Sequence, residues 1–249
     1  MALRNPLKRS ERSSPNQMTL VEHFAELRRR LVICVLTVAA GAVVGFVVYP
    51  QILKFLQDPY CRANHGDCGL YITAPLDGLT LRIKIAVFAG LFMALPVILY
   101  QLWRFIVPAL KPTERNYAVP FVVASVVLFA AGAWTAYFTF EHALVFLGAV
   151  GGPELKQIYN PNQYLMLILM MMLIFGLTFE FPVILVALEL AHVVTPAQLM
   201  KQWRWAVMGI TVAAAVFTPS GDPVSMLILA LPLVAFYFIA IGIGKLFGR

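Results

Sequence analysis

The chain has 249 residues, of which 61% are hydrophobic and only 12% charged, and its net charge is +7. Soluble domains average about half apolar and a quarter charged residues, so this composition excludes an ordinary soluble domain. The apolar residues fall in blocks of roughly 15–25, the length that crosses a hydrocarbon layer of about 30 Å. The basic excess therefore indicates membrane orientation, and not nucleic-acid binding, because no basic face is interleaved with aromatic rings.

Six apolar blocks predict an all-α polytopic membrane protein with six transmembrane helices. The predicted helices span about residues 31–49, 79–103, 117–140, 164–190, 203–217 and 224–246. Blocks such as 121–133 and 165–177 have almost no polar face, unlike the helices of soluble proteins. The fifth block has only 15 residues and would span about 22 Å, and Gly242 and Gly244 shorten the effective span of the sixth. The bilayer is therefore expected to thin beside these two helices.

Basic residues indicate which side is inside. Fourteen Lys and Arg residues lie in the two terminal segments and in the second and fourth connections, against five elsewhere. Short loops rich in Lys and Arg remain in the cytoplasm, so both termini are expected there, which agrees with an even number of helices. Residues 1–17 are expected to form a basic, disordered tail, and residues 18–249 a single transmembrane domain.

The first external connection, about residues 50–78, contains Cys61 and Cys68, which six residues separate. The outer side of a bacterial-type membrane is oxidising, so a local disulfide is favoured over two unpaired thiols. A zinc site would need more ligands than these cysteines and His65 supply. Cys34 lies within the first predicted helix, where it is expected to be an inert small hydrophobe.

Glu180 is an acid well inside the fourth apolar block, 16 residues after Tyr164 and 10 before Leu190. A charge at that depth costs a few kcal/mol, so the carboxyl must be protonated, paired or facing a water-filled cavity. Gly176 leaves room beside it, and Pro182 frees a backbone carbonyl near Thr178. Two interpretations stay open: a polar site for a ligand or partner helix, or a neutral acid hydrogen-bonded to a neighbouring helix.

Glu26 and Glu114 are acids within basic segments of the predicted cytoplasmic face. The spacing of apolar residues around Glu26 suits a short amphipathic helix lying on the membrane surface. The two acids are either solvated counter-ions of their arginine neighbours or a receptor for a cationic peptide, through charge-assisted Arg–carboxylate bonds.

Asp222 lies in the tight turn between the fifth and sixth blocks, where a capping or turn role is expected. The sequence contains no metalloprotease, nucleophile-elbow or phosphate-loop motif. Ser220 also lacks a partnered histidine, so an intramembrane protease is not expected. No enzyme activity, metal or cofactor is predicted.

Four stretches together resemble the TatC family, the receptor subunit of the twin-arginine translocase. They are 23–31 (HFAELRRRL), 96–110 (PVILYQLWRFIVPAL) followed by Glu114-Arg115, 175–183 (FGLTFEFPV), and Thr218-Pro219 followed by Asp222. They occur in the family's order, and the resemblance covers about residues 18–245. Pro59 falls where the family has a proline in its first external loop, whereas the Cys61–Cys68 segment departs from the family pattern.

The resemblance implies a cupped six-helix receptor in a bacterial-type cytoplasmic membrane. Such a receptor binds signal peptides with paired arginines, self-associates in a larger complex, and works with single-span TatA- and TatB-type partners. Folded proteins then cross the membrane, driven by the proton gradient. Carried over by residue, Glu26 and Glu114 would contact the arginine pair, with Arg28 and Phe105 in the same patch. Glu180 would be a polar spot in the concave face, and Pro59 and Asp222 would serve external-loop positions important to transport.

Two other functions stay open on the residues alone. A proton-coupled secondary transporter with Glu180 as its proton site predicts internal repeats with broken helices in matching positions, and the sequence shows no such repeats. A purely structural scaffold for other membrane subunits predicts that reversing the charge of Glu26 has no effect.

Overall fold

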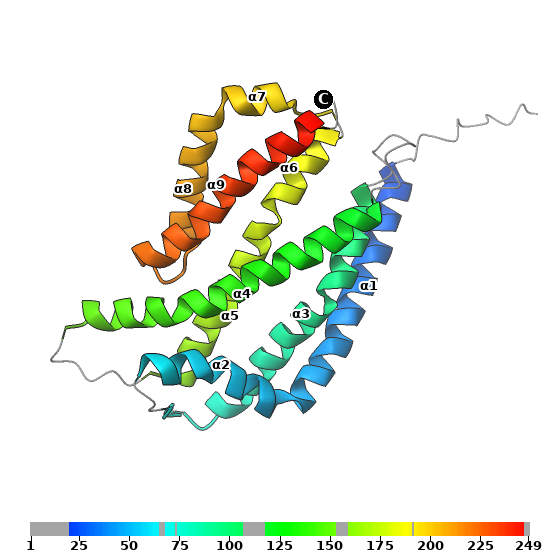
Figure 1. Cartoon of the computed structure of the whole chain (residues 1–249). Helices are drawn as coiled ribbons and strands as arrows, with labels where there is room; N and C mark the ends of the chain where they lie inside the picture. Colours follow the sequence, from blue (N-terminus) through cyan, green and yellow to red (C-terminus); the bar gives the residue numbers. More distant parts are fainter. Residues whose placement is uncertain are drawn as a thin grey trace, which may run out of the picture.

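The computed structural model describes residues 20–64, 68–72, 74–106, 118–152, 159–190 and 192–246. All regular secondary structure in these residues is helical, as predicted (Figure 1). The helices in chain order are α1 (Leu20–Val47), α2 (Tyr49–Ala63), α3 (Asp77–Ile106), α4 (Ala118–Val150), α5 (Pro161–Phe179), α6 (Phe181–Leu190), α7 (Pro196–Lys201), α8 (Trp203–Phe217) and α9 (Pro223–Leu246).

Five helical segments of the described chain are long and apolar enough to cross a membrane. They are Phe24–Val47, Asp77–Arg104, Val119–Val150, Pro161–Leu190 and Pro223–Leu246. The remaining predicted span is α8, which begins and ends at the predicted residues and has only 15 of them. At 1.5 Å per residue α8 is about 22 Å long, shorter than the hydrocarbon layer. Figure 1 shows α8 and α9 side by side, joined by a tight turn.

The helix α1 is continuous from Leu20, so the prediction of a separate surface helix around Glu26 is wrong. Its first 21 residues contain neither glycine nor proline and are rich in Leu, Ala, Glu and Arg, which favour an uninterrupted helix. The chain bends only at Val48, before Pro50. Pro50 lies in the first turn of α2, where its missing N–H costs no hydrogen bond. Part of the predicted first connection is therefore helical.

The helix α2 packs against α4 and α5 through aromatic contacts and hydrogen bonds to its backbone. The rings of Phe55 and Tyr137 stack at 4.3 Å between centroids. The Tyr137 hydroxyl donates to the Phe55 carbonyl at 3.0 Å, and the Tyr164 hydroxyl donates to the Leu56 carbonyl at 2.7 Å. Pro59 is fully buried in this interface. These contacts fix the direction of α2 across the ends of the longer helices.

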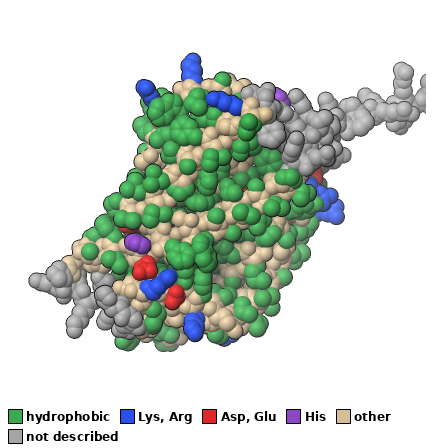
Figure 2. Space-filling model, in the orientation of Figure 1, with side chains coloured by type: hydrophobic (Ala, Val, Ile, Leu, Met, Phe, Trp, Pro, Cys, Tyr) green, Lys and Arg blue, Asp and Glu red, His purple; other side chains and the backbone are tan. Residues whose placement is uncertain are grey.

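The end of α2 carries a disulfide and a charged cluster. The sulfurs of Cys61 and Cys68 are bonded to each other. Arg62 lies 3.5 Å from Asp58 one turn earlier and 3.5 Å from Glu141 on α4. Figure 2 shows acidic and basic side chains gathered on this otherwise apolar face. Since both ion pairs are partly exposed, they position α2 more than they stabilise it.

The fourth predicted helix is broken at Glu180 into α5 and α6, which together still form one 30-residue span. Pro182 has no N–H and cannot bond to the Thr178 carbonyl, so the helix is interrupted between these two residues. The third predicted helix extends ten residues beyond its predicted end, to Val150. The short helix α7 was not predicted. It begins with a capping box in which the side chains of Thr195 and Gln198 each bond to the other's backbone.

Candidate functional site

A largely buried arginine side chain holds Glu26 near the start of α1. The Arg30 Nε donates to the Glu26 Oε1 at 3.2 Å, and the Arg30 Nη2 bonds to the same oxygen. The Arg30 Nη1 donates to the backbone carbonyl of Gln101 at 3.1 Å. One guanidinium therefore ties the carboxylate on α1 to the last turns of α3.

The two partners differ in exposure. The side chain of Arg30 is 12% exposed and that of Glu26 is 30% exposed. Arg28, two residues after Glu26, is exposed. The largely buried Arg30 guanidinium therefore orients the partly exposed Glu26 carboxylate. Such a carboxylate can accept charge-assisted hydrogen bonds from a further cationic group.

Not every residue predicted for this patch can be placed. Glu114 and the tail 1–17 lie outside the described residues, and the Phe105 side chain is likewise outside them. The backbone of residue 105 belongs to α3, four residues beyond Gln101, whose carbonyl bonds to Arg30. The structure thus brings the start of α1 and the end of α3 together.

Glu180 is buried at the junction of α5 and α6, where its side chain is 7% exposed. Its carboxyl is hydrogen-bonded to the hydroxyl of Ser125 on α4. The Trp103 Nε1 on α3 donates to the same hydroxyl oxygen at 3.1 Å. The Glu180 Oε1 has no hydrogen-bond partner within the described part of the chain. A polar chain therefore crosses the bundle from Trp103 through Ser125 to Glu180.

The space beside Glu180 is occupied by protein. A Cβ on Gly176 would lie 2.6 Å from the Phe129 ring, so this glycine accommodates an aromatic side chain of α4. The room that the sequence led us to expect for a ligand at Gly176 is therefore filled.

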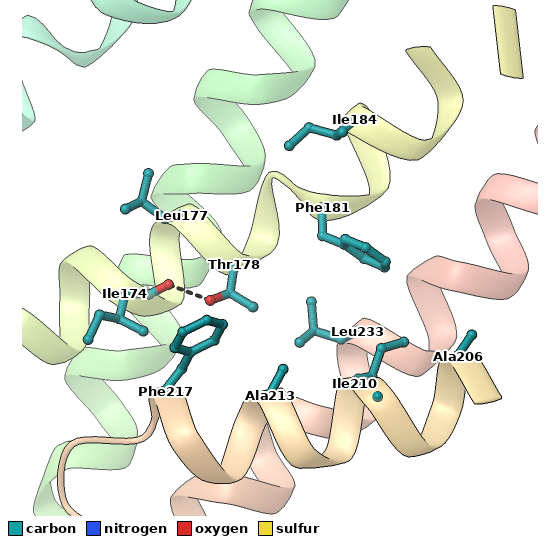
Figure 3. A pocket seen from close by; sticks show the side chains of 11 residues that line it. Ile174, Leu177, Thr178, Phe181, Ile184, Ala206, Ile210, Ala213, Phe217 and Leu233 are labelled. Atoms are coloured by element: carbon teal, nitrogen blue, oxygen red, sulfur yellow. Dashed lines mark hydrogen bonds between the residues drawn. The ribbon is translucent and has the colours of Figure 1, made fainter. Parts of the chain in front are cut away.

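An apolar groove of about 540 Å³ opens among α5, α6, α8 and α9 (Figure 3). Its walls include Thr178 and Phe181 from the α5–α6 junction, Ile210 and Phe217 from α8, and Leu233 from α9. The Thr178 hydroxyl donates to the Ile174 carbonyl at 2.6 Å, which leaves the groove almost without unpaired polar groups. Glu180 does not line the groove, although its neighbours Thr178 and Phe181 do. The groove suits an apolar helix or chain.

Asp222 is fully buried in the turn between α8 and α9. Its Oδ1 accepts from the Ser225 backbone N–H at 2.6 Å, and the Ser220 hydroxyl donates to its Oδ2. The carboxylate thus caps the start of α9, next to Pro223 at its first position.

Four further side chains were not singled out from the sequence: three are linked to these acids in the structure, and the fourth is another buried acid. Arg30 was considered only as one of several basic residues that set orientation and neighbour Glu26, while Ser125 and Trp103 are ordinary residues for apolar helices. Glu189 is a second buried acid, 2% exposed, and neither of its carboxylate oxygens has a partner among the described residues. It lies against Gly244 of α9, where a Cβ would be 2.4 Å from its Oε2. Its place in the fourth apolar block was the signal that could have found it.

Comparison with known proteins gives one consistent answer. Residues 22–232 match the family described as Sec-independent protein translocase protein (TatC). A protein of that name from Frankia casuarinae is 41% identical, over 97% of this chain and 70% of its own length. One from Aquifex aeolicus is 34% identical, over 93% of this chain and 97% of its own length.

A comparison with solved structures gives the same family. A crystal structure described as the twin-arginine translocase receptor TatC matches with a TM-score of 0.74 and 34% identity. The match covers 92% of this chain and all of that chain. The chain belongs to the TatC family of Sec-independent protein translocase proteins.

Proposed function

We propose that this protein is the receptor that binds twin-arginine signal peptides for a Sec-independent translocase. Membership of a translocase family, rather than of a catalytic one, supports this function. The observation that supports a particular binding site is the carboxylate of Glu26, which Arg30 orients and which is partly exposed where α1 meets α3. Glu114, Arg28 and Phe105 complete the proposed patch.

The chemistry of the patch favours arginine over lysine in the ligand. Arginine presents a planar fork of N–H donors that bonds to two carboxylate oxygens, whereas the lysine ammonium is a point charge. Each charge-assisted hydrogen bond contributes about 1.5–3 kcal/mol, which corresponds to about 10- to 150-fold in affinity. Two acids facing two adjacent arginines would therefore distinguish paired arginines from paired lysines.

The apolar groove supplies a second contact in this proposal. The apolar part of a bound signal peptide, or a partner helix, would occupy the groove beside Thr178 and Phe181. Single-span TatA- and TatB-type subunits are the proposed partners, other copies of this chain are the proposed neighbours, and the proton gradient is the proposed energy source. The start of α1, the junction of α7 and α8 and the end of α9 lie toward one end of the helix bundle (Figure 1). These segments carry Arg28, Arg29, Arg30, Lys201, Arg204 and Lys245. We therefore place that end, with both termini, in the cytoplasm of a bacterial-type cell. Pro59 and Asp222 then lie on the opposite side.

The direct test is peptide binding to the purified full-length protein in detergent, followed by fluorescence anisotropy. Wild type should bind a labelled twin-arginine peptide, and a peptide with two lysines should bind at least about tenfold more weakly. Glu26→Ala and Glu114→Ala should each weaken the arginine peptide by a similar factor. Glu141→Ala is the matched control, since this acid also pairs with an arginine but at the α2–α4 contact. Equal binding by all variants would refute the proposed site.

A further inference from the structure

Two cationic side chains lie near the start of α3, inside one of the apolar spans. Arg82 and Lys84 are five and seven residues after Asp77, the first residue of this span. A cation inside a membrane span needs a partner or a path to the head groups, because an unpaired charge in hydrocarbon costs several kcal/mol. The structure supplies such a partner for one of the two.

Arg82 is paired within the protein. Its Nη2 donates to the carbonyl of Phe46 at 3.1 Å. Its guanidinium lies 4.1 Å from the centroid of the Phe46 ring and 5.3 Å from that of Tyr49. A carbonyl and two aromatic rings therefore stabilise this charge.

Lys84 has much weaker contacts. Its Nζ lies 3.4 Å from the Asn162 Oδ1, close to the upper limit of a hydrogen bond. An ammonium carries three donors, and no carboxylate lies within ion-pair distance of Lys84 in the described residues. The side chain is only partly buried, so its charge remains accessible.

Lys84 borders a groove with a polar end and an apolar wall. The groove has a volume of about 440 Å³ and also includes Asn162 and Gln163 at the start of α5, with Leu167 and Met170 farther along that helix. Such a division suits an amphiphile, whose anionic head would meet the lysine and whose apolar chain would follow α5. A soluble anion would use only the polar end.

The depth of the groove fits a lipid head group. Pro219, in the turn that ends α8, lines the same groove as Lys84. Since α8 is only about 22 Å long, the hydrocarbon layer beside it must end near this turn. Head groups of lipids next to α8 and α9 therefore lie at the level of Lys84, although this residue is two turns inside α3.

We propose that this groove binds one anionic phospholipid from the leaflet on the side of the α8–α9 turn. The lipid phosphate accepts hydrogen bonds from the Lys84 ammonium and the Gln163 amide, and an acyl chain lies against Leu167 and Met170. Charge-assisted hydrogen bonds between an ammonium and a phosphate are stronger than bonds between neutral groups. The site is separate from the Glu26 patch and does not depend on the proposed peptide binding.

The test is lipid retention by the full-length protein, measured by native mass spectrometry after equilibration with equal amounts of phosphatidylglycerol and phosphatidylcholine. Wild type should retain one phosphatidylglycerol in preference to phosphatidylcholine, and Lys84→Gln should reduce that preference about fivefold. Lys84→Arg, which keeps the charge, should retain most of the preference. Lys54→Gln is the matched control, because Lys54 is exposed on α2, outside the groove.

Two results would overturn the proposal. One is an unchanged preference in Lys84→Gln, or a loss as large in Lys54→Gln, since either would show that the groove is not the site. The other is displacement of the retained lipid by inorganic phosphate at the same concentration, which would identify a soluble anion as the ligand. Thermal unfolding of each variant establishes whether it is folded. If Lys84→Gln is not folded, the comparison of Lys84→Arg with wild type still tests the proposal.

Discussion

At the scale of single residues, the acids and the local partner of Glu26 could be predicted from the sequence, but partners distant in the chain could not. Glu26 and Glu180 are conspicuous because each is an acid in or beside an apolar block. Arg30 is one turn from Glu26, so their pairing follows from helical spacing. The bond from Arg30 to the Gln101 carbonyl crosses 71 positions of the chain and depends on how two helices pack. Ser125 reaches Glu180 in the same way.

Removing the Ser125 hydroxyl should destabilise the protein. Ser125→Ala leaves both the Trp103 N–H and the Glu180 carboxyl without their shared partner in a buried site. An unsatisfied buried polar group costs about 1–3 kcal/mol, so the midpoint of thermal unfolding in detergent should fall by several degrees.

The control for this change is Thr135→Val on the same helix. The Thr135 hydroxyl donates to the Ala131 carbonyl of its own helix, so its loss should have little effect. If Ser125→Ala were as stable as Thr135→Val, the polar chain from Trp103 to Glu180 would contribute nothing to the fold.

At the scale of elements, the sequence predicted the apolar helices well and their ends poorly. The bounds of α8 were correct because the short, mainly apolar run that begins at Trp203 ends before Thr218-Pro219. The continuous α1 was missed because its charged first turns look like a surface segment. These charged turns remain helical outside the apolar span because α1 packs against α3. The helix α2 was missed because its 15 residues are too few and too polar to span a membrane, although Ile52, Leu53, Leu56 and Tyr60 recur at the spacing of an amphipathic helix.

Close packing of α1 on α3 should depend on Gly90. A Cβ at this position would lie 2.5 Å from the Ala42 nitrogen and from the Val38 carbonyl oxygen, both backbone atoms. Gly90→Ala must therefore separate the two helices, and overpacking of this kind costs about 1–3 kcal/mol. The expected result is a lower midpoint of thermal unfolding and, because the Arg30–Gln101 bond joins the same helices, weaker peptide binding.

Gly242→Ala serves as its control. This exposed α9 glycine would place a Cβ in open space, and alanine is the better helix former by about 1 kcal/mol. Its unfolding midpoint should stay the same or rise. A Gly90→Ala protein as stable as Gly242→Ala would show that α1 and α3 do not need this close approach.

At the scale of the whole molecule, the unequal lengths of the spans have a consequence for the bilayer. The candidate span made of α5 and α6 has 30 residues, whereas α8, which we propose as the sixth span, has 15. A layer of uniform thickness cannot match both, so we expect the bilayer to thin beside α8 and α9. Lys84 at the level of the α8–α9 turn is consistent with such thinning.

Cysteine labelling can test both the orientation and the thinning, in a Cys34→Ala background. Gln202→Cys and Val216→Cys mark the two ends of α8 at exposed positions about 21 Å apart. A membrane-impermeant maleimide should label Val216→Cys in intact cells, and Gln202→Cys only in inverted vesicles. Val127→Cys, exposed at the tenth residue of α4, should not react from either side.

Two other labelling patterns would contradict the proposed orientation or the proposed thinning. Labelling of Gln202→Cys in intact cells would reverse the proposed orientation. Protection of Val216→Cys from both sides would place the end of α8 inside hydrocarbon, and the bilayer would then not be thinned at this turn.

The most direct test of the central claim is a double-mutant cycle between Glu26 and the paired arginines of a signal peptide. The affinities of wild type and Glu26→Gln would be measured with the native peptide and with peptides in which either arginine is replaced by glutamine. If Glu26 contacts one arginine, that pair should show a coupling free energy of about 1.5–3 kcal/mol, and the other arginine should couple to Glu114. Additive effects, with no coupling between Glu26 and either arginine, would contradict the account and assign Glu26 a role within the protein rather than in peptide binding.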